Sequence, residues 1–128
     1  MFDHLSLGVA DLDRSQAFYD RTLATLGIER HSNFPGAAGY GATPDGASFW
    51  IGTPTEAGRP PQPSGGMHIA FNAKDRPSVD AFYKAALAAG GRDNGAPGLR
   101  PIYHPNYYGA FVFDPDGHKI EACCHLPA

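Results

Sequence analysis

The chain contains 128 residues, of which 42% are hydrophobic and 18% are charged, and this length and composition are typical of a single domain with its own core. The net charge of -3 and the scattered lysines and arginines argue against a nucleic-acid partner, which needs clustered positive charge. No apolar stretch is long enough to predict a membrane span, so we expect no membrane partner. Residues 1–10 contain no signal-peptide pattern, and we therefore expect a cytoplasmic protein.

The two halves of the chain repeat each other. Residues 4–28 align with residues 68–92 without a gap, at an offset of 64, and eight of the 25 aligned positions are identical. A second match joins the Pro-Asp-Gly triplets at residues 44–46 and 115–117, at an offset of 71. The chain is therefore predicted to consist of two similar modules.

The first module covers about residues 1–53. An alternating apolar run predicts its first strand at residues 4–9, and Asp11 is placed to accept hydrogen bonds from the free amides at the start of a helix. Apolar residues near helical spacing predict this helix over residues 13–26, and Gly27 provides the left-handed conformation that often ends a helix. Further strands are predicted at residues 28–34, 38–43 and 47–52.

A linker rich in proline and glycine occupies residues 54–66, and the second module covers about residues 67–128. This module repeats the order of elements, with Asp75 before its helix and Pro77 in the first helical turn. The predicted elements are a strand at residues 68–73, a helix at 77–89, and strands near 92–96, 108–114 and 118–124. The two modules together are expected to form one domain.

The predicted fold class is α+β, with two tandem βαβββ modules that form a half-open barrel around a shared cleft. One module alone would leave a face of its small sheet uncovered by its single helix, and two modules solve this jointly, with the helices outside. Residues at equivalent positions of the repeat would then face each other across a pseudo-twofold axis. Polar residues repeated at a strand start are therefore the first candidates for a site.

Two histidines and one glutamate meet this description. His4 and His68 occupy equivalent positions at the start of a strand, and together they favour a metal site, whereas either alone would indicate a histidine satisfied by one hydrogen bond. Glu121 lies between Ile120 and Ala122 in the last predicted strand, where a carboxylate is costly to bury unless it is paired or binds a cation. The alternative for Glu121 is a surface residue on an edge strand.

The sequence resembles the vicinal oxygen chelate superfamily, also called the glyoxalase, bleomycin-resistance and dioxygenase superfamily. The resemblance rests on HLSLGVADLDRSQAFYDRTLATLGI at residues 4–28, GMHIAF at residues 66–71 and FVFDPDGHKIEACC at residues 111–124. It implies paired modules that hold one divalent metal ion at the cleft, with ligands from four repeat-equivalent positions. Three of these positions carry ligand-type residues, namely His4, His68 and Glu121.

The fourth position carries Trp50, where a glyoxalase I would have its second metal-binding carboxylate. This difference weakens the assignment to that lyase, whereas two imidazoles and one carboxylate resemble the ligand set of the extradiol dioxygenases. The ion would be Fe²⁺, Mn²⁺, Ni²⁺ or Zn²⁺. Trp50 is expected to be a wall of the pocket or a core residue, and Phe49 offers a second aromatic surface. Cys123 shares the face of Glu121 by alternation and is expected to line the same pocket.

The tyrosine-rich segment 101–109 is predicted to lie near the cleft. The resemblance to the dioxygenases implies that a histidine and a tyrosine position oxygen and move protons. The candidates for these catalytic roles are Tyr103, His104, Tyr107 and Tyr108. The alternative is a rigid connection between strands.

These observations lead to three functional hypotheses. The first is a small metal-dependent enzyme, a dioxygenase or a lyase or isomerase, that acts on a vicinally oxygenated small molecule. The second is a metal-free module that resembles the bleomycin-resistance proteins and sequesters a ligand in an aromatic cleft. The third is a transferase that resembles the fosfomycin-resistance enzymes. It would need a basic anion pocket, for which only Arg92, Arg100 and Lys119 lie near the relevant strands.

A homodimer is expected, because modules in this superfamily pair within one chain or by exchange between two chains. In an exchanged dimer, one site would combine His4 of one subunit with His68 and Glu121 of the other. The linker over residues 54–66 is long enough for either arrangement.

Overall fold

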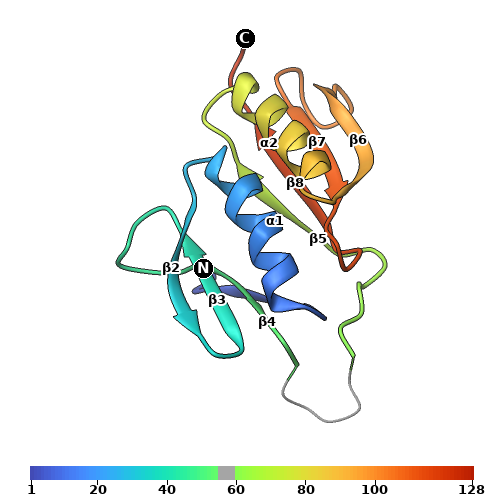
Figure 1. Ribbon diagram of the computed structural model, residues 1–128. Helices are drawn as coiled ribbons and strands as arrows, with labels where there is room; N and C mark the ends of the chain where they lie inside the picture. Colours follow the sequence, from blue (N-terminus) through green and yellow to red (C-terminus); the bar gives the residue numbers. More distant parts are fainter. Residues whose placement is uncertain (55–59) are drawn as a thin grey trace.

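The chain folds into two βαβββ modules, as the sequence predicts (Figure 1). The computed structural model describes residues 1–54 and 60–128, so residues 55–59 of the predicted linker 54–66 lie outside the described residues. The first module contains β1 (Leu5–Gly8), α1 (Leu12–Ala24), β2 (Glu29–Phe34), β3 (Ala37–Gly41) and β4 (Phe49–Gly52). The second contains β5 (His68–Asn72), α2 (Arg76–Ala88), β6 (Arg92–Leu99), β7 (Tyr108–Phe113) and β8 (Lys119–Cys124). Neither of these two helices is long and apolar enough to cross a membrane.

Both helices begin at the predicted aspartates. The side chain of Asp11 accepts a hydrogen bond from the backbone N–H of Arg14 at 3.1 Å, and that of Asp75 accepts one from the N–H of Ser78 at 2.8 Å. These bonds satisfy amides that have no partner inside the helix. After α1, Gly27 adopts a φ of +75°, a left-handed conformation that glycine accepts without steric cost.

Each module forms its own four-stranded sheet, and the two sheets have the same topology. The strand orders are β1-β4-β3-β2 and β5-β8-β7-β6, and the described strands close no barrel. Ser6 pairs with Trp50 in the first sheet, and Ala70 pairs with Glu121 in the second. Because Ser6 and Ala70 are equivalent at the offset of 64, this register confirms that Trp50 and Glu121 occupy equivalent places.

One continuous core joins the two modules. It contains the apolar faces of both sheets and both helices, and its fully buried side chains include Phe18, Tyr40, Phe82, Ile51 and Ile120. Helix α1 lies in the middle of the molecule, beside the first sheet and against α2 (Figure 1). The helices therefore lie where the modules of one chain meet, although the sequence interpretation placed them outside a joint barrel.

A cluster of hydrogen bonds fastens the turn between β7 and β8 to the first module. We call its side chains, Tyr19, Asp114, Asp116 and His118, the intermodule clasp. The hydroxyl of Tyr19 donates to Oδ2 of Asp114 at 2.6 Å, and Nε2 of His118 lies 2.7 Å from the carbonyl oxygen of Gly8. These bonds join residues that are far apart in the sequence, so they stabilise the way the two modules pack.

The carboxylate of Asp114 is the buried centre of the intermodule clasp, with 1% of the residue exposed. Burial raises its pKa, and the hydrogen bond from Tyr19 opposes that rise. Burial also raises the pKa of Tyr19, so its hydroxyl remains a donor. Asp116 adds a second attachment, because its Oδ1 accepts a hydrogen bond from the backbone N–H of Ala10 at 2.9 Å.

Candidate functional site

The candidate site lies on the face of the second sheet that points away from α2, which we call the open face of that sheet. Side chains alternate along β8, so Ile120 and Ala122 enter the core while Glu121 and Cys123 point to the open face. His68 is the first residue of β5, the strand that pairs with β8. Its Nε2 lies 3.1 Å from Oε1 of Glu121. The structure therefore brings His68 and Glu121 together, and their role as metal ligands stays a prediction.

Glu121 is only 2% exposed, and both of its carboxylate oxygens have partners. Oε1 lies beside His68, whose side chain is 40% exposed, and Oε2 accepts a hydrogen bond from the hydroxyl of Tyr107. Gly109 makes room for this carboxylate, because a Cβ at that position would lie 3.0 Å from Oε2. A carboxylate removed from water needs such partners or a cation.

Tyr107 holds its proton firmly. Burial, and then hydrogen bonds with Glu121 and Cys123, raise the pKa of its hydroxyl above the ordinary value. Burial likewise raises the pKa of the Cys123 thiol, so this cysteine is not a ready thiolate. Tyr107 therefore acts as a donor that orients the Glu121 carboxylate.

His104 and His125 extend these contacts toward solvent. Nδ1 of His104 accepts a hydrogen bond from the backbone N–H of Asn106 at 3.1 Å, which leaves Nε2 to carry the proton of the neutral ring. That Nε2 lies 2.6 Å from Nδ1 of His125, and Nε2 of His125 lies 3.8 Å from Sγ of Cys123. The N–H of Asn106 thus decides which nitrogen of His104 donates, so the hydrogen bonds through His104, His125 and Cys123 follow one order of donors and acceptors.

The other two predicted catalytic tyrosines lie further from Glu121. Tyr103 is 57% exposed and packs edge to face on Tyr107 at a centroid separation of 4.9 Å. Tyr108 points to the opposite face of the sheet, where its hydroxyl donates to Oδ1 of Asp80 on α2 at 2.6 Å. The structure therefore brings His104 and Tyr107 into the network around Glu121 and directs Tyr108 away from it.

His4 lies apart from the other two predicted ligands. Its side chain is 53% exposed, and its Nδ1 lies 2.5 Å from Oδ1 of Asp3. Within residues 1–54 and 60–128, no three histidine, cysteine or acidic side chains lie close enough together to hold one metal ion. His68 and Glu121 themselves fit such an ion, because two ligands at about 2.1 Å from a metal are separated by roughly 3 Å. One chain thus provides two of the three predicted ligands together.

Phe49 and Trp50 point to opposite sides of β4. Phe49 is 4% exposed and lines an apolar cavity of about 290 Å³ between the modules, together with Ile69 and Phe71 of β5. Trp50 is half-buried on the face of the first sheet that carries Ser6, which we call the open face of the first sheet. Phe49 therefore lines a cavity between the modules, whereas Trp50 lies on the open face of the first sheet.

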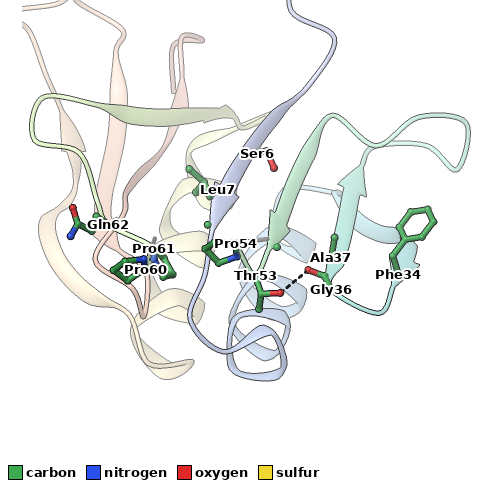
Figure 2. A pocket seen from close by; sticks show the side chains of 12 residues that line it. Ser6, Leu7, Phe34, Gly36, Ala37, Thr53, Pro54, Pro60, Pro61 and Gln62 are labelled. Carbon is green, nitrogen blue, oxygen red and sulfur yellow. Dashed lines mark hydrogen bonds between the residues drawn. The ribbon is translucent and has the colours of Figure 1, made fainter. Parts of the chain in front are cut away.

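A larger cleft of about 730 Å³ lies on the first module, beside Pro54 and residues 60–62 of the linker (Figure 2). Figure 2 shows Ser6 and Leu7 of β1, Pro54 and Pro60 around it. None of the described residues that line it is acidic, basic or a histidine. This cleft offers space and apolar contact, whereas the groups capable of acid-base chemistry or metal binding lie on the second sheet.

The fold and its repeat agree with a known family. The chain matches the family model described as Glyoxalase/Bleomycin resistance protein/Dioxygenase superfamily over residues 1–122. It belongs to this superfamily. The resemblance that the sequence motifs predict is therefore confirmed, and so is the α+β fold of paired βαβββ modules.

Solved structures of this superfamily share the whole architecture. A glyoxalase/bleomycin resistance protein from Albidiferax ferrireducens T118 is 38% identical, with a TM-score of 0.87 over 97% of this chain and 98% of that chain. A glyoxalase-related enzyme from Fulvimarina pelagi is 22% identical, with a TM-score of 0.73 over 97% and 87% of the two chains. A lactoylglutathione lyase from Agrobacterium tumefaciens is 21% identical, with a TM-score of 0.65 over 97% and 92%. No curated protein matches the chain.

Sequence reasoning did not single out the intermodule clasp. A signal was present, because Asp114 directly precedes the second Pro-Asp-Gly triplet, whereas the equivalent position before the first triplet is Thr43. A carboxylate added to only one copy of a repeated turn indicates a contact that the other copy does not make.

Proposed function

We propose that this member of the superfamily is a metal-dependent enzyme that acts on a small molecule with neighbouring oxygen atoms. The observation that carries the proposal is the buried carboxylate of Glu121, with Nε2 of His68 3.1 Å from its Oε1 on an open face of the sheet. An imidazole and a carboxylate in this arrangement suit Fe²⁺, Mn²⁺, Ni²⁺ or Zn²⁺. Membership of the superfamily supports the same assignment.

The third ligand is proposed to be His4 of the partner subunit in a homodimer. Within one chain the modules pack through their helices, and the exposed His4 side chain lies on the first module. If two chains exchange modules, the open face of the first sheet in one subunit lies opposite the open face of the second sheet in the other. The metal site is then complete only in the dimer.

A divalent ion bound there would act as a Lewis acid toward the neighbouring oxygens of the substrate. The chain's own residues would hold and move protons around it. Tyr107 orients Glu121 through its hydrogen bond to Oε2. His104 and the exposed His125 form a path for protons between Cys123 and solvent, because the donor and acceptor roles of their nitrogens follow in one order.

A dioxygenase is favoured over a lyase of the glyoxalase I kind. Trp50 occupies the place equivalent to Glu121, so the first module does not provide a second carboxylate there. A second candidate function, a metal-free ligand-binding module, is favoured by the separation of His4 from the other two ligands within the described part of one chain.

Metal binding and subunit complementation test the proposal together. Untagged protein is expected to be a dimer by light scattering and to bind one ion per subunit by calorimetry. The variants Glu121→Ala and His4→Ala are each expected to weaken binding by at least about 100-fold, because each removes a ligand. A heterodimer made from the two variants is expected to regain one ion, since one of its two sites combines three native ligands.

The matched control is Trp50→Phe, which changes the position equivalent to Glu121 and should bind the ion as the native chain does. Retention of the ion by Glu121→Ala would show that the ligand set is wrong. A heterodimer without metal would place all ligands within one chain. Native protein that binds none of the four ions would support the metal-free binding module.

A further inference from the structure

Two cations share one aromatic ring on the open face of the second sheet. Nζ of Lys119 lies 4.9 Å from the ring centroid of Phe111, and Cζ of Arg100 lies 5.5 Å from the same centroid. We call these three residues the cation platform. The Phe111 ring lies 6.0 Å from the ring of His68, and Phe111 pairs in register with Glu121. The cation platform therefore borders the candidate metal ligands.

The backbone of β6 forms a recess for the guanidinium of Arg100. The register of β6 with β7 shifts on both sides of Gly95. A Cβ on Gly95 would lie 3.3 Å from Nη2 of Arg100, and a Cβ on Gly98 would lie 3.2 Å from Nη1. Nη2 also donates to the carbonyl oxygen of Ala96 at 2.8 Å. Two glycines thus allow the arginine to lie close to the strand in a fixed position.

The positive charge of the cation platform has no carboxylate partner in the described part of the chain, where neither Lys119 nor Arg100 forms an ion pair. Glu121 follows Lys119 by two residues on the same face, and its oxygens are engaged by His68 and Tyr107. An anion bound at this face would lie near positive charge that no carboxylate of the described residues neutralises.

We infer that the cation platform binds an oxyanion, either a carboxylate or a phosphoryl group. Arg100 can present N–H donors in a planar fork, Lys119 supplies a compact charge, and Phe111 forms an apolar floor. An acid group bound here would place the next atoms of the same molecule beside His68 and Glu121. The substrate class is then a small organic acid with neighbouring oxygens. That last step rests on the proposed function, whereas anion binding itself does not.

An anion titration of metal-free protein tests the inference without any contribution from a bound ion. Amide NMR spectra are recorded at constant ionic strength with acetate, with inorganic phosphate, and with neutral acetamide. We expect saturable shifts at the amides of Gly95, Gly98 and Lys119 with one or both anions and none with acetamide. A preference for acetate identifies a carboxylate subsite, and a preference for phosphate identifies a phosphoryl subsite.

Substitutions assign the binding to the cation platform. Lys119→Gln and Arg100→Gln are each expected to raise the Kd of the preferred anion about tenfold, and Arg100→Lys less, because it keeps the charge but loses the planar fork. The matched control is Arg92→Gln. Cζ of Arg92 lies 5.0 Å from the ring centroid of Phe113, which pairs with Lys119, so the control removes one charge and one cation–aromatic contact at a neighbouring ring that is not part of the platform.

Two results would overturn the inference. The first is the absence of saturable shifts with both anions up to about 100 mM, because a specific subsite would have a Kd below this concentration. The second is an equal rise in the Kd of the anion in Arg92→Gln and Lys119→Gln, which would show that the anion responds only to the overall charge of the protein. Loss of metal binding in the complementation experiment would leave the anion titration unchanged, so the two proposals fail separately.

Discussion

The open faces of the two sheets have equivalent backbones and different side chains. Glu121 of the second sheet corresponds to Trp50 of the first. Beside them on the neighbouring strand, Phe111 pairs with Glu121, whereas Gly39 pairs with Trp50. At these positions the second face therefore carries a carboxylate and the ring of the cation platform, while the first carries an indole ring and a glycine.

This difference shows how a repeated fold divides its functions. The backbone topology decides which positions face each other, and side-chain volume and charge decide what each face can do. A Cβ on Gly39 would lie 2.9 Å from the ring of Trp50, so the first face accommodates the indole only because the adjacent strand has no side chain there. On the second face, Gly109 makes the corresponding room for Glu121.

The largest stability effect is expected at the contact between Trp50 and β3. In Gly39→Ala, the added methyl group would lie 2.7 Å from the Cβ of Ala47 and 2.9 Å from the indole. We expect a loss of about 1–3 kcal/mol in the free energy of unfolding, from overpacking. Gly46→Ala is the control, because a methyl group added there would meet nothing within 4 Å. Urea unfolding at one protein concentration measures both, and an equal effect would contradict the steric argument.

The next effect is expected at two tyrosines that are equivalent in the repeat. Tyr19 is fully buried and donates to Asp114 of the other module, whereas Tyr83 donates to Asp93 within its own module at 3.0 Å. Tyr19→Phe is expected to cost about 1–2 kcal/mol in the free energy of unfolding, because it leaves a buried carboxylate with one donor fewer. Tyr83→Phe should cost much less. Similar losses in thermal unfolding would contradict the distinction between the fully buried tyrosine and the partly buried one.

The Tyr19→Phe effect is also expected to depend on pH. The hydrogen bond from Tyr19 lowers the pKa of Asp114, although burial keeps that pKa above its ordinary value. The bond therefore favours the charged carboxylate, and its contribution is full above the pKa of Asp114 and shrinks as the pH falls through it. The difference in the free energy of unfolding between the native protein and Tyr19→Phe should become smaller as the pH is lowered from neutral to acidic. A difference that does not change with pH would show that the contribution of this hydrogen bond does not depend on the ionisation of Asp114.

The smallest effect is expected at the surface of the first module. Nη2 of Arg30 lies 2.9 Å from Oδ2 of Asp20, and their side chains are 31% and 37% exposed. Arg30→Gln is expected to cost about 0.2–1 kcal/mol, because water and salt screen an exposed pair. Repeating the urea unfolding at high salt should reduce the loss. If Arg30→Gln lost more unfolding free energy than Gly39→Ala, the surface ion pair would matter more for stability than the packing around Trp50, which would contradict the expected order.

Local features of the fold could be predicted because short-range physics decides them. Asp11 and Asp75 cap helices wherever those helices pack, since they satisfy amides only three residues away. Alternation along β8 places Glu121 and Cys123 on one face, whatever that face meets. The offset of 71 residues between the two Pro-Asp-Gly triplets could likewise predict that Trp50 and Glu121 are equivalent, because repeated strands pair in the same register.

The candidate site could be predicted only in part. Its pair of His68 and Glu121 follows from neighbouring strands of one module, and that part is observed. The approach of Arg100 to Phe111 depends on the two register shifts between β6 and β7. Such irregularities arise from packing and glycine placement, which no local pattern of polar and apolar residues encodes.

By itself, the sequence determined two βαβββ modules, their helix caps, and the acidic position on the last strand. Only the tertiary structure decided that the modules of one chain meet through α1 and the intermodule clasp, which leaves His4 apart from His68 and Glu121. The physical reason is the range of the interactions. Caps and alternation are decided within a few residues, whereas module packing depends on a buried bond between residues 95 positions apart.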